Sequence, residues 1–486
     1  MSAPFITCVM VLYFSALLLI SYFTSRNADS QTFFTANKQS SWYLVAFGMI
    51  GTSISGVTFI SVPGLVGKLN FGYFQIVMGY VVGYAIIGLV LMPLYYRLNL
   101  ISIYTYLEQR FGYWSYKTGS AFFLLSRTIG SSLRLYLAAS VLQIFLFDRL
   151  NVPFYVTVTV TIFLIWIYTF KGGVKTIIWT DSFQTVFLIG SLIVSVHLIS
   201  TELGWSLPTM IKEVSQSNYS QIFFFDDFKS NQYFWKQFIS GIFIAIVMTG
   251  LDQDLMQKNL TCKSIGEAQK NMFWFTITLV IVNILFLTLG AMLYLYCEAK
   301  GIAIPSRTDD LFPMLALNHF GTFAGLCFLL GIIASSYASA DSALASLTTA
   351  FCIDFLDFKN KTEAVKQKQK FAVHVGFSVL FLLVIIVFRA INSKDVISQV
   401  LGIAAYTYGP LLGLFAFGIL TRRKLIDKFA PLVCVLSPLA TYFIASNSEY
   451  LFSGYKFSFE TLIVNGALCF VGLYLCSSSS KNSSLL

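Results

Sequence analysis

Hydrophobic residues are gathered in runs of about 20 positions that recur along the whole chain, separated by short polar stretches. A run of this length lets a helix cross the hydrocarbon core of a bilayer, so the pattern predicts an all-α protein with many membrane-spanning helices. Thirteen such segments can be marked. The predicted spans are 4–23, 42–66, 72–97, 118–147, 152–170, 175–200, 235–256, 271–298, 322–356, 369–389, 396–420, 428–446 and 458–476.

The Lys and Arg residues between these segments predict an orientation. With the N-terminus outside, twenty of them fall in inward-facing loops and ten in outward-facing loops, and an excess of cations marks the cytoplasmic side. No Lys or Arg precedes the first span, which favours a retained helix over a cleaved signal peptide. We therefore predict a multi-pass protein of the plasma (inner) membrane, with its N-terminus outside and its C-terminus in the cytoplasm.

The whole chain, residues 1–486, is expected to form a single transmembrane transporter domain. Its longest loop, 201–234, is expected outside and could carry a short helix. Two stretches each begin with a glycine-interrupted span, as the inverted halves of many transporters do, while close helix packing also explains the glycines. The expected parts are an extra N-terminal helix with its inner loop (1–41), a first repeat (42–200), a second repeat (235–420), two C-terminal helices (428–476) and a disordered tail (477–486).

Composition narrows the class of protein further. The chain is 57% hydrophobic and 11% charged, whereas soluble domains carry about 25% charged residues. The net charge of +10 is explained by cytoplasmic loops, because no basic stripe interleaved with aromatic residues indicates a nucleic-acid surface. The eight cysteines form no CxxC pair and the three histidines stand alone, so we expect no enzymatic centre.

The second predicted span contains a cluster of small and hydroxyl residues, GTSISGVT at 51–58. Two glycines and four hydroxyl side chains in eight positions weaken helical hydrogen bonding. An unwound backbone at membrane depth must line a cavity, where its carbonyl oxygens can coordinate a cation. The alternative is close packing of two helices through small residues.

The ninth span carries a row of hydroxyl groups. Ser335, Ser339, Ser342 and Ser346 recur at helical spacing and therefore share one face. Such a row suits Na⁺, a hard cation that prefers oxygen ligands, although serines also bond their own backbone in packing faces. Asp341 lies in the same span, and an intramembrane carboxylate is a functional candidate by default.

Two acidic positions lie in other spans. Asp181, at the inner part of the sixth span, could bind a cation or form a structural ion pair with Arg127 or Arg134. Asp252 begins an acidic segment at the inner end of the seventh span, beside a loop rich in lysine. Its composition is compatible both with a solvated inner gate of exchanging ion pairs and with an ordinary amphipathic helix end.

Five stretches together resemble the sodium:solute symporter family, which includes sodium-coupled sugar, proline, sialate, vitamin and iodide transporters. They occur in the family's order, and the similarity covers about residues 1–475. The resemblance implies a leucine-transporter-type 5+5 inverted repeat, with one extra N-terminal and two extra C-terminal helices, 13 transmembrane helices in all. The stretches are ISGVTFISVPG (54–64), YLEQRFG (106–112), GGVKTIIWTDSFQ (172–184), TGLDQDLMQKNLTCKS (249–264) and SADSALASLTTAFCIDF (339–355).

The resemblance also implies a main Na⁺ site between the broken second span and the ninth span. Matching the family's motifs places the ligands at Gly51, Ile54, Ser335, Ala338 and Ser339. Ala338 departs from the family pattern because it has no hydroxyl group. Either one ligand is lost, or the register shifts and Ser335 with Ser336 serves instead. We prefer Ser335 and Ser339, which share a face.

Some family members bind an additional Na⁺. The resemblance places this second site at Asp181 on the sixth span and at Asp341 and Ser342 on the ninth. Two buried carboxylates repel each other, and a cation between them would relieve the repulsion. Compensation by Arg127 or Arg134 is the alternative. The resemblance further implies that Asp252 belongs to an inner gate.

Solute-binding residues are less specifically indicated. Sugar-transporting members of the family carry an amide near the position of Thr58 and an acid near that of Val77, and this chain has neither group. Thr58 and Gln75 are the candidate polar contacts, and Phe59 and Met248 are candidate apolar walls.

We therefore expect a Na⁺-coupled secondary active symporter that imports a small organic solute by alternating access, with Na⁺ as its only ion. The expected partners are Na⁺, the solute and the lipid bilayer, with no nucleic acid and no obligate protein partner. The alternative is a non-transporting solute sensor or channel-like relative of the same fold. The short inner loops, which leave no room for a signalling domain, weigh against this alternative.

Overall fold

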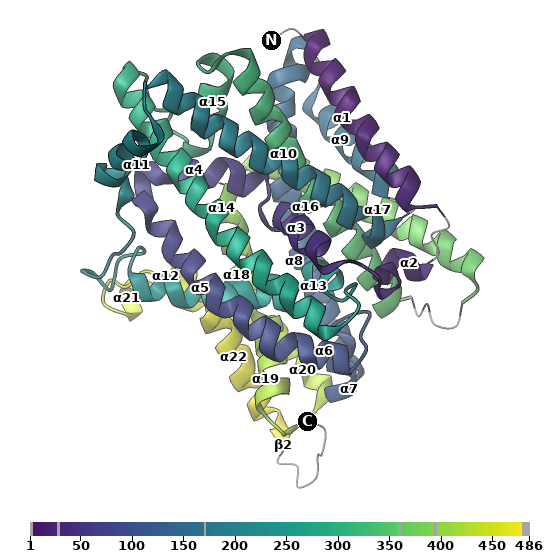
Figure 1. Cartoon of the computed structure of the whole chain (residues 1–486). Coiled ribbons are helices and arrows are strands. Elements are labelled where there is room, and N and C mark those ends of the chain that lie inside the picture. Colours follow the sequence, from purple (N-terminus) through teal and green to yellow (C-terminus); the bar gives the residue numbers. More distant parts are fainter. Residues whose placement is uncertain are drawn as a thin grey trace.

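The computed structural model describes residues 3–26, 30–169, 172–356, 358, 361–391 and 396–478, and helices make up most of it (Figure 1). Each predicted hydrophobic segment coincides with one helix or with consecutive helical pieces. These are α1 (Ala3–Thr24), α3 (Trp42–Ser53) with α4 (Gly56–Leu69), α5 (Tyr73–Ile86) with η3 (Ile87–Leu91) and α6 (Met92–Arg97), α8 (Tyr113–Leu142) with η4 (Gln143–Phe147), α9 (Phe154–Thr169), α10 (Gly173–Glu202), α12 (Phe234–Ala245) with η7 (Ile246–Gly250) and α13 (Gln253–Asn259), α14 (Ile265–Lys300), α16 (Gly321–Asp354), α17 (Glu363–Ile391), α18 (Val396–Thr407) with α19 (Gly409–Leu420), α20 (Ala430–Ser446) and α22 (Thr461–Leu475).

Shorter elements lie between these helices. The helix expected within 201–234 is present as α11 (Leu207–Gln216). The others are α2 (Ser30–Thr35), η1 (Ala36–Lys38), η2 (Asn70–Gly72), α7 (Thr105–Arg110), η5 (Asp148–Leu150), η6 (Asn218–Ser220), η8 (Thr308–Asp310), α15 (Leu311–Asn318), β1 (Lys424–Leu425), η10 (Asp427–Phe429), α21 (Ser448–Leu451) and β2 (Ser477–Ser478).

Capping residues explain where the long helices begin and end, and α14 is an example. The Ser264 side chain accepts a hydrogen bond from the Glu267 N–H at 3.3 Å at its start. Gly301 adopts a positive φ of 64° at its end, a conformation that glycine adopts without strain. Its 36 residues, at about 1.5 Å each, exceed the thickness of about 30 Å of a bilayer's hydrocarbon core.

Membrane-spanning helices are confirmed by length and composition. In the described part of the chain, 7 helices are long and apolar enough to cross a membrane, or up to 9 spans if each bent pair counts as one. One bend, of 69°, separates Phe234–Gly250 from Gln253–Asn259, and the other, of 46°, separates Val396–Thr407 from Gly409–Leu420. The protein is therefore a multi-pass membrane protein, while the count of thirteen spans stays a prediction.

The first helix break lies between α3 and α4, where the sequence predicts unwinding. Ile54 (φ −87°, ψ 79°) and Ser55 (φ −75°, ψ 172°) leave the helical conformation. Gly56 restarts the helix against α16, so closely that a Cβ atom at position 56 would lie 2.0 Å from Ser336 Oγ. Glycine at this position therefore lets the backbone of the break touch α16.

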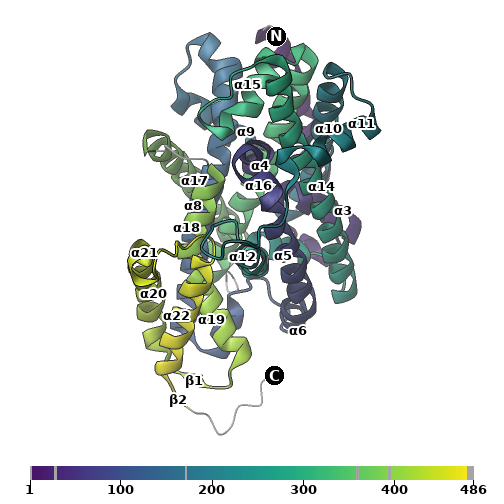
Figure 2. The same cartoon turned by 90° about the vertical axis from the view of Figure 1, so that its left-hand side faces the viewer.

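Helix α16 runs through the interior of the bundle (Figure 2). Residues 331–350 are all buried, and the helix packs against α3, α4, α8 and α10. The predicted row of hydroxyl groups is thus surrounded by protein, so no part of it faces lipid.

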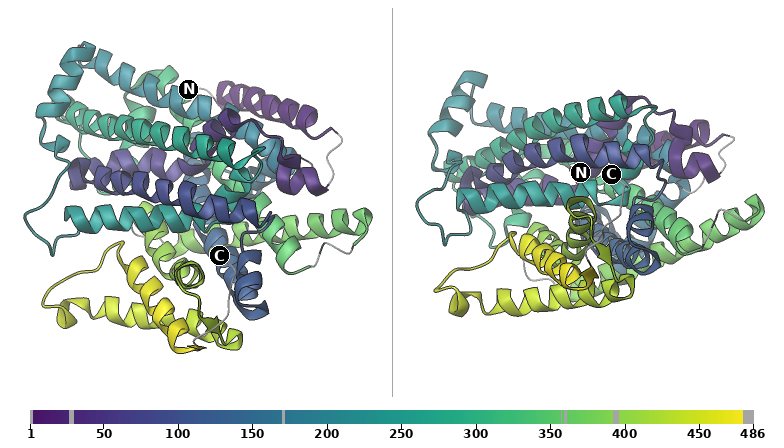
Figure 3. Two further views of the ribbon diagram at one scale, coloured as in Figure 1. Left: turned by 60° about the horizontal axis from the view of Figure 1, so that its bottom comes forward. Right: turned by 90° about the horizontal axis from the view of Figure 1, so that it is seen from below.

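The C-terminal helices α19, α20 and α22 gather at the end of the molecule opposite the N-terminus (Figures 1 and 3). Strands β1 and β2 join the segments that follow α19 and α22, pairing Lys424 with Ser478 and Leu425 with Ser477. The prediction of disorder from residue 477 onward is therefore wrong for Ser477 and Ser478, because pairing with β1 satisfies their backbone groups. Residues 479–486 lie outside the described part of the chain.

The long loop that carries α11 packs against a second loop, between α21 and α22. The Lys229 ammonium donates a hydrogen bond to the Ser453 carbonyl at 2.6 Å, and Lys236 forms an ion pair with Glu460 at 3.4 Å. These contacts hold the loop at the entrance to α12.

Candidate functional site

Helices α3, α10 and α16 meet at Gly51. A Cβ atom at this position would lie 2.6 Å from Thr185 Oγ1 of α10 and 3.4 Å from the Cβ of Ala338 on α16. The Gly51 N–H donates to Thr185 Oγ1 at 3.1 Å. The structure therefore brings together two of the predicted Na⁺ ligands, Gly51 and Ala338, through a contact that a larger residue would prevent.

Several buried oxygen atoms near this junction lack a hydrogen-bond partner. Ser339 Oγ and Ser336 Oγ have none among the described residues, and both side chains are fully buried. The backbone carbonyls of Gly51 and Ile54 likewise accept no hydrogen bond in the described part of the chain. Because such groups cost free energy unless a ligand satisfies them, the set fits a hard cation such as Na⁺.

The rest of the hydroxyl row on α16 is already engaged. Ser335 and Ser346 donate to backbone carbonyls of the preceding turn at 3.0 and 2.9 Å. Ser342 donates to the carboxylate of Asp254 on α13. Among the described serines of α16, the hydroxyls without a partner are therefore those of Ser336 and Ser339, beside the first helix break.

Asp181 of α10 is fully buried, and its partner is Lys258 of α13. The Lys258 ammonium contacts Asp181 Oδ2, which also accepts a hydrogen bond from the Thr52 hydroxyl at 2.8 Å. Asp181 Oδ1 has no partner among the described residues. The alternative expectation that Arg127 or Arg134 compensates Asp181 is wrong, because the bend before α13 turns Lys258 toward α3 and α10.

Asp341 belongs to the same buried region. Its Oδ2 accepts a hydrogen bond from the Tyr168 hydroxyl at 2.9 Å, and its Oδ1 accepts one from the Ser342 N–H at 2.5 Å. Asp341 and Asp181 interact electrostatically. The Ser342 hydroxyl, the third group predicted for a second Na⁺ site, is bonded to Asp254 instead.

Asp252 marks the second helix break and caps α13. Its carboxylate accepts hydrogen bonds from the Asp254 N–H at 2.9 Å and from the Tyr408 hydroxyl. Asp252, Asp254 and Lys258 are each at most 1% exposed. The contact with solvent that was expected of this segment, both as a solvated inner gate and as an amphipathic helix end, is therefore wrong, because α13 lies inside the bundle against α2, α3, α10 and α16.

Polar contacts fasten α13 on several sides. Arg127 of α8 pairs with Asp254, and its Nη1 lies 3.8 Å from Asp252 Oδ2. Gln253 accepts from the backbone N–H of Ile103 at 2.9 Å, and Gln257 donates to the Phe34 carbonyl at 2.7 Å. These contacts connect α13 to α8, to the segment before α7 and to α2.

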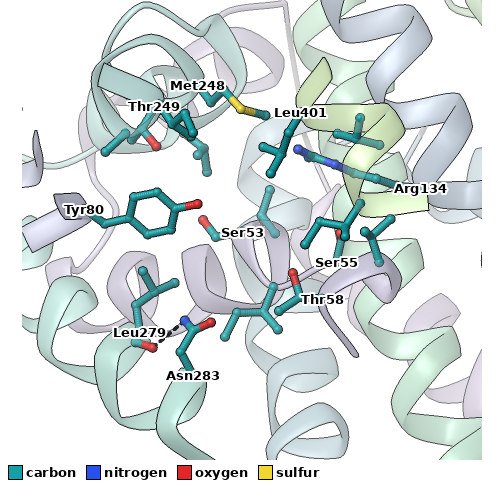
Figure 4. A pocket seen from close by; sticks show the side chains of 18 of the residues that line it. Ser53, Ser55, Thr58, Tyr80, Arg134, Met248, Thr249, Leu279, Asn283 and Leu401 are labelled. Carbon is teal, nitrogen blue, oxygen red and sulfur yellow. Dashed lines mark hydrogen bonds between the residues drawn. The ribbon is translucent and has the colours of Figure 1, made fainter. Parts of the chain in front are cut away.

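A cavity of about 100 Å³ lies beside the first helix break (Figure 4). Two of the predicted solute contacts, Thr58 and Met248, line it. Hydroxyl and amide groups from several helices give it a mixed polar and apolar wall. The polar groups other than arginines are on Thr52, Ser53, Ser55, Thr58, Tyr73, Tyr80, Tyr84, Thr249 and Asn283.

The other two predicted solute contacts do not line this cavity. Phe59 is fully buried and packs against the rings of Phe312 and Phe328, at centroid distances of 5.5 and 5.7 Å. Gln75 lines a separate pocket, where its amide donates to the Gln232 carbonyl of the long loop at 2.9 Å. Phe59 was chosen beside the break and Gln75 in the next span by resemblance to the family, but their side chains face other elements.

Two arginines of α8 line the cavity. Arg127 and Arg134 are seven residues apart and so share one helix face. Arg127 is paired with Asp254, whereas Arg134 has no ion pair or hydrogen bond among the described residues. Figure 4 shows the Arg134 side chain reaching into the cavity from one wall, with Tyr80 and Ser53 on another. An unpaired guanidinium at such a place fits an anionic ligand.

Sequence reasoning located these arginines inside a span but did not assign them to a ligand site. The only signal in the sequence was that a charged residue lies within a membrane span, which indicates a functional role but not which group the arginine binds. Tyr80 and Asn283 gave no signal, because isolated polar residues are common in membrane helices. The cavity gathers residues from helices that are distant in sequence.

Comparison with known proteins gives sodium-coupled transporters among the relatives of this chain. The chain is 26% identical to the sodium/sialic acid symporter of Aliivibrio fischeri, over 97% of this chain and 92% of that protein. It is 23% identical to the sodium/sialic acid symporter of Proteus mirabilis, over 85% and 84%. It is 26% identical to sodium-coupled monocarboxylate transporter 2 of Bos taurus, over 81% and 64%.

Solved structures share the fold. A Na⁺-coupled sialic acid symporter in a substrate-bound outward-open state has a TM-score of 0.83 at 20% identity, over 97% of both chains. The nucleobase-cation-symport-1 family transporter Mhp1, in a closed conformation, has a TM-score of 0.54 at 14% identity, over 92% and 94%. The chain thus has a helical membrane transporter fold with leucine-transporter-like architecture. The model of one family matches residues 33–425, and the chain belongs to that family, the sodium:solute symporter family.

Proposed function

We propose that this sodium-coupled symporter imports a small organic carboxylate, together with Na⁺, by alternating access. The observation that carries the carboxylate assignment is Arg134, a guanidinium that forms no ion pair with any described residue and lines a cavity beside the first helix break. Sialic acid and monocarboxylates, which the names of the relatives specify, share a carboxylate group. An arginine can bind such a group with two parallel hydrogen bonds.

The proposed main Na⁺ site uses the carbonyls of Gly51 and Ile54, the hydroxyl of Ser339 and backbone oxygens of Ser335 and Ala338. Its support is the contact of Gly51 with Ala338 and the absence of a partner on Ser339 Oγ in the described part of the chain. Ser336 Oγ, unpartnered and beside Gly56, could replace the hydroxyl that Ala338 lacks. A register that includes Ser336 therefore remains part of the proposal.

A second Na⁺ at Asp181, Asp341 and Ser342 is the further proposal from the sequence. Such an ion would have to use Asp181 Oδ1, because Oδ2 is occupied by Lys258 and Thr52. A Hill coefficient for Na⁺ near 2 that falls to near 1 in Asp181→Asn would support this site. A value near 1 in both proteins would contradict it.

Asp252 is proposed to act in the inner gate through its bond with Tyr408 and its position at the second break. Opening toward the cytoplasm would require α13 to separate from some of its partners. We expect Asp252→Ala to impair transport while Na⁺ binding from outside stays measurable.

Membrane placement completes the proposal. We propose 13 transmembrane helices with a 5+5 inverted repeat, the N-terminus outside and the C-terminus in the cytoplasm, in the plasma membrane. In that orientation, one Na⁺ moving inward through 100 mV contributes about 2.3 kcal/mol to solute uptake. A non-transporting sensor or channel-like protein is not favoured, since the named relatives are symporters and transporters.

Uptake into proteoliposomes tests the proposed function. With an inward Na⁺ gradient, we expect accumulation of sialic acid or of a short monocarboxylate such as lactate, and none of the corresponding uncharged amides. Arg134→Gln should abolish uptake and Arg134→Lys should retain part of it. Arg307→Gln, which alters an exposed arginine whose ion pair in the described part of the chain is with nearby Asp310, is the matched control. Equal uptake of acids and amides, or full activity in Arg134→Gln, would contradict the carboxylate assignment.

A further inference from the structure

We infer that Asp254 is the positioning residue that couples the solute cavity to the Na⁺ sites. This inference rests on the proposed function and concerns how one site influences the other. Asp254 lies in the first turn of α13 and is 1% exposed. Its two carboxylate oxygens have different partners: Oδ2 contacts the Arg127 guanidinium, and Oδ1 contacts the Ser342 hydroxyl. One side chain therefore connects α8, α13 and α16.

At one end of this connection is the cavity. Arg127 lines the cavity two turns before Arg134, on the same face of α8. Its Nε–H has no partner among the described residues, so the guanidinium retains donor capacity. An anion bound in the cavity would attract Arg127 and would compete with Asp254 for it.

At the other end is the cation region of α16. Ser342 follows Asp341 and lies one turn after Ser339, whose hydroxyl is unsatisfied among the described residues. A hydroxyl oxygen that coordinates a cation keeps its hydrogen, and polarisation by the cation makes that hydrogen a stronger donor to a carboxylate. Na⁺ bound at Ser342 would therefore strengthen the hydrogen bond from Ser342 to Asp254.

Both contacts are made by the carboxylate of Asp254, so a change in the strength of one contact alters the strength of the other. When Na⁺ strengthens the hydrogen bond from Ser342 to Asp254, Asp254 holds Arg127 less tightly, and Arg127 can bind the solute. Conversely, a solute that attracts Arg127 away from Asp254 lets Asp254 bind Ser342 more tightly. Coupling of this kind is reciprocal, and it typically changes affinity by about 5- to 150-fold. Asp254→Asn keeps the volume of the side chain but removes the charge that holds both partners.

The test is a measurement of coupling on the purified full chain in detergent. Dissociation constants for sialic acid and for lactate are measured in NaCl and in choline chloride. We expect Na⁺ to tighten binding of the recognised acid within the range of about 5- to 150-fold in the wild type, and by less than about twofold in Asp254→Asn. A residue that only holds α13 in place would change both constants and leave their ratio unchanged. An unchanged ratio in Asp254→Asn therefore overturns the inference.

Glu460→Gln is the matched control, because it also removes one acid from a largely buried ion pair, but at the loop between α21 and α22. Its Na⁺-dependent ratio should equal that of the wild type. If neither acid binds the wild type, the carboxylate assignment fails, and a second measurement still decides the coupling.

That measurement is hydrogen–deuterium exchange of the peptide covering α13, without solute. Na⁺ should slow exchange in α13 of the wild type and of Glu460→Gln. In Asp254→Asn, Na⁺ should still protect α3 and α16 but no longer α13. Equal Na⁺ protection of α13 in Asp254→Asn, or none in the wild type, overturns the inference.

Discussion

The two helix breaks at the centre of the protein differ in the chemistry that they bring inside. Between α3 and α4, residues 51–58 contain only small, hydroxyl and aliphatic side chains, and their free groups are neutral oxygens. At the second break, the chain carries Asp252, just before α13, and Asp254 and Lys258, within α13, into the interior, each paired with a group from another segment.

This contrast offers a physical explanation of how one fold could both bind a mobile ion and keep its helices in place. Neutral oxygens attract Na⁺ but can exchange it for water, so an ion can bind and leave. Buried charges that are paired within the protein are costly to separate, so they specify how α13 sits. In the function proposed above, the first break would therefore provide the ion site, and the second would provide a gate held by ion pairs.

The largest expected effect is the loss of folding stability when the buried ion pair at the second break is broken. Lys258→Met leaves Asp181 buried without its cation, and loss of one partner of a buried pair costs about 3–5 kcal/mol. We expect a strongly lowered thermal unfolding midpoint in detergent, partly restored in the double variant Lys258→Met/Asp181→Asn. Lys236→Met, at the outer pair with Glu460, is the control and should have a smaller effect. A midpoint equal to that of the wild type would show that α13 does not depend on this pair.

A steric change tests the first break. In Gly56→Ala, the new Cβ atom would lie 2.0 Å from Ser336 Oγ, and overpacking of this kind costs about 1–3 kcal/mol. We expect weaker Na⁺ binding, measured by the Na⁺-dependent rise of the unfolding midpoint.

The same clash can be relieved from the other side. Ser336→Ala removes the Oγ atom, and the remaining Cβ would lie 3.4 Å away, an ordinary contact. The double variant Gly56→Ala/Ser336→Ala should therefore recover folding stability. Failure to recover would mean that the contact with Ser336 Oγ is not the reason why position 56 needs glycine.

Ser339→Ala is expected to have a smaller, ion-specific effect. Removal of one unsatisfied hydroxyl from the proposed site should raise the Na⁺ concentration for half-maximal uptake by roughly tenfold, which is about 1.4 kcal/mol. The solute KM at saturating Na⁺ should stay near its wild-type value. Ser346→Ala, whose hydroxyl bonds the backbone two turns further along α16, is the control. Equal Na⁺ dependence in both variants would place the ligand elsewhere.

The smallest effect is expected from Tyr408→Phe. This change removes the hydroxyl that donates to Asp252 but keeps the ring, and one hydrogen bond contributes about 0.5–1.5 kcal/mol. We expect a turnover rate lowered by a few-fold with unchanged half-saturation for Na⁺. A shift in Na⁺ half-saturation instead would assign Tyr408 to the ion site and weaken the distinction between the two breaks.

Helix positions were predictable because burial in a bilayer demands long hydrophobic runs, and each of these runs is helical. The unwinding at Ile54 and Ser55 was predictable too, since glycine and hydroxyl residues cluster there. The burial of the charged residues at the inner end of the seventh span was not predictable, because an amphipathic helix end and a buried gate have the same composition. Only the 69° bend decides that α13 turns inward.

Local composition and periodicity were enough to predict a helical membrane protein, an interrupted second span and a hydroxyl face on α16, because neighbouring residues share these properties. The packing of distant segments was needed to show that Lys258 pairs with Asp181 and that Phe59 and Gln75 face away from the cavity. It was also needed to show that Arg134 faces into the cavity without an ion pair among the described residues. The physical reason is that charge pairs and cavities form between side chains from distant segments, so no local pattern records which of them meet.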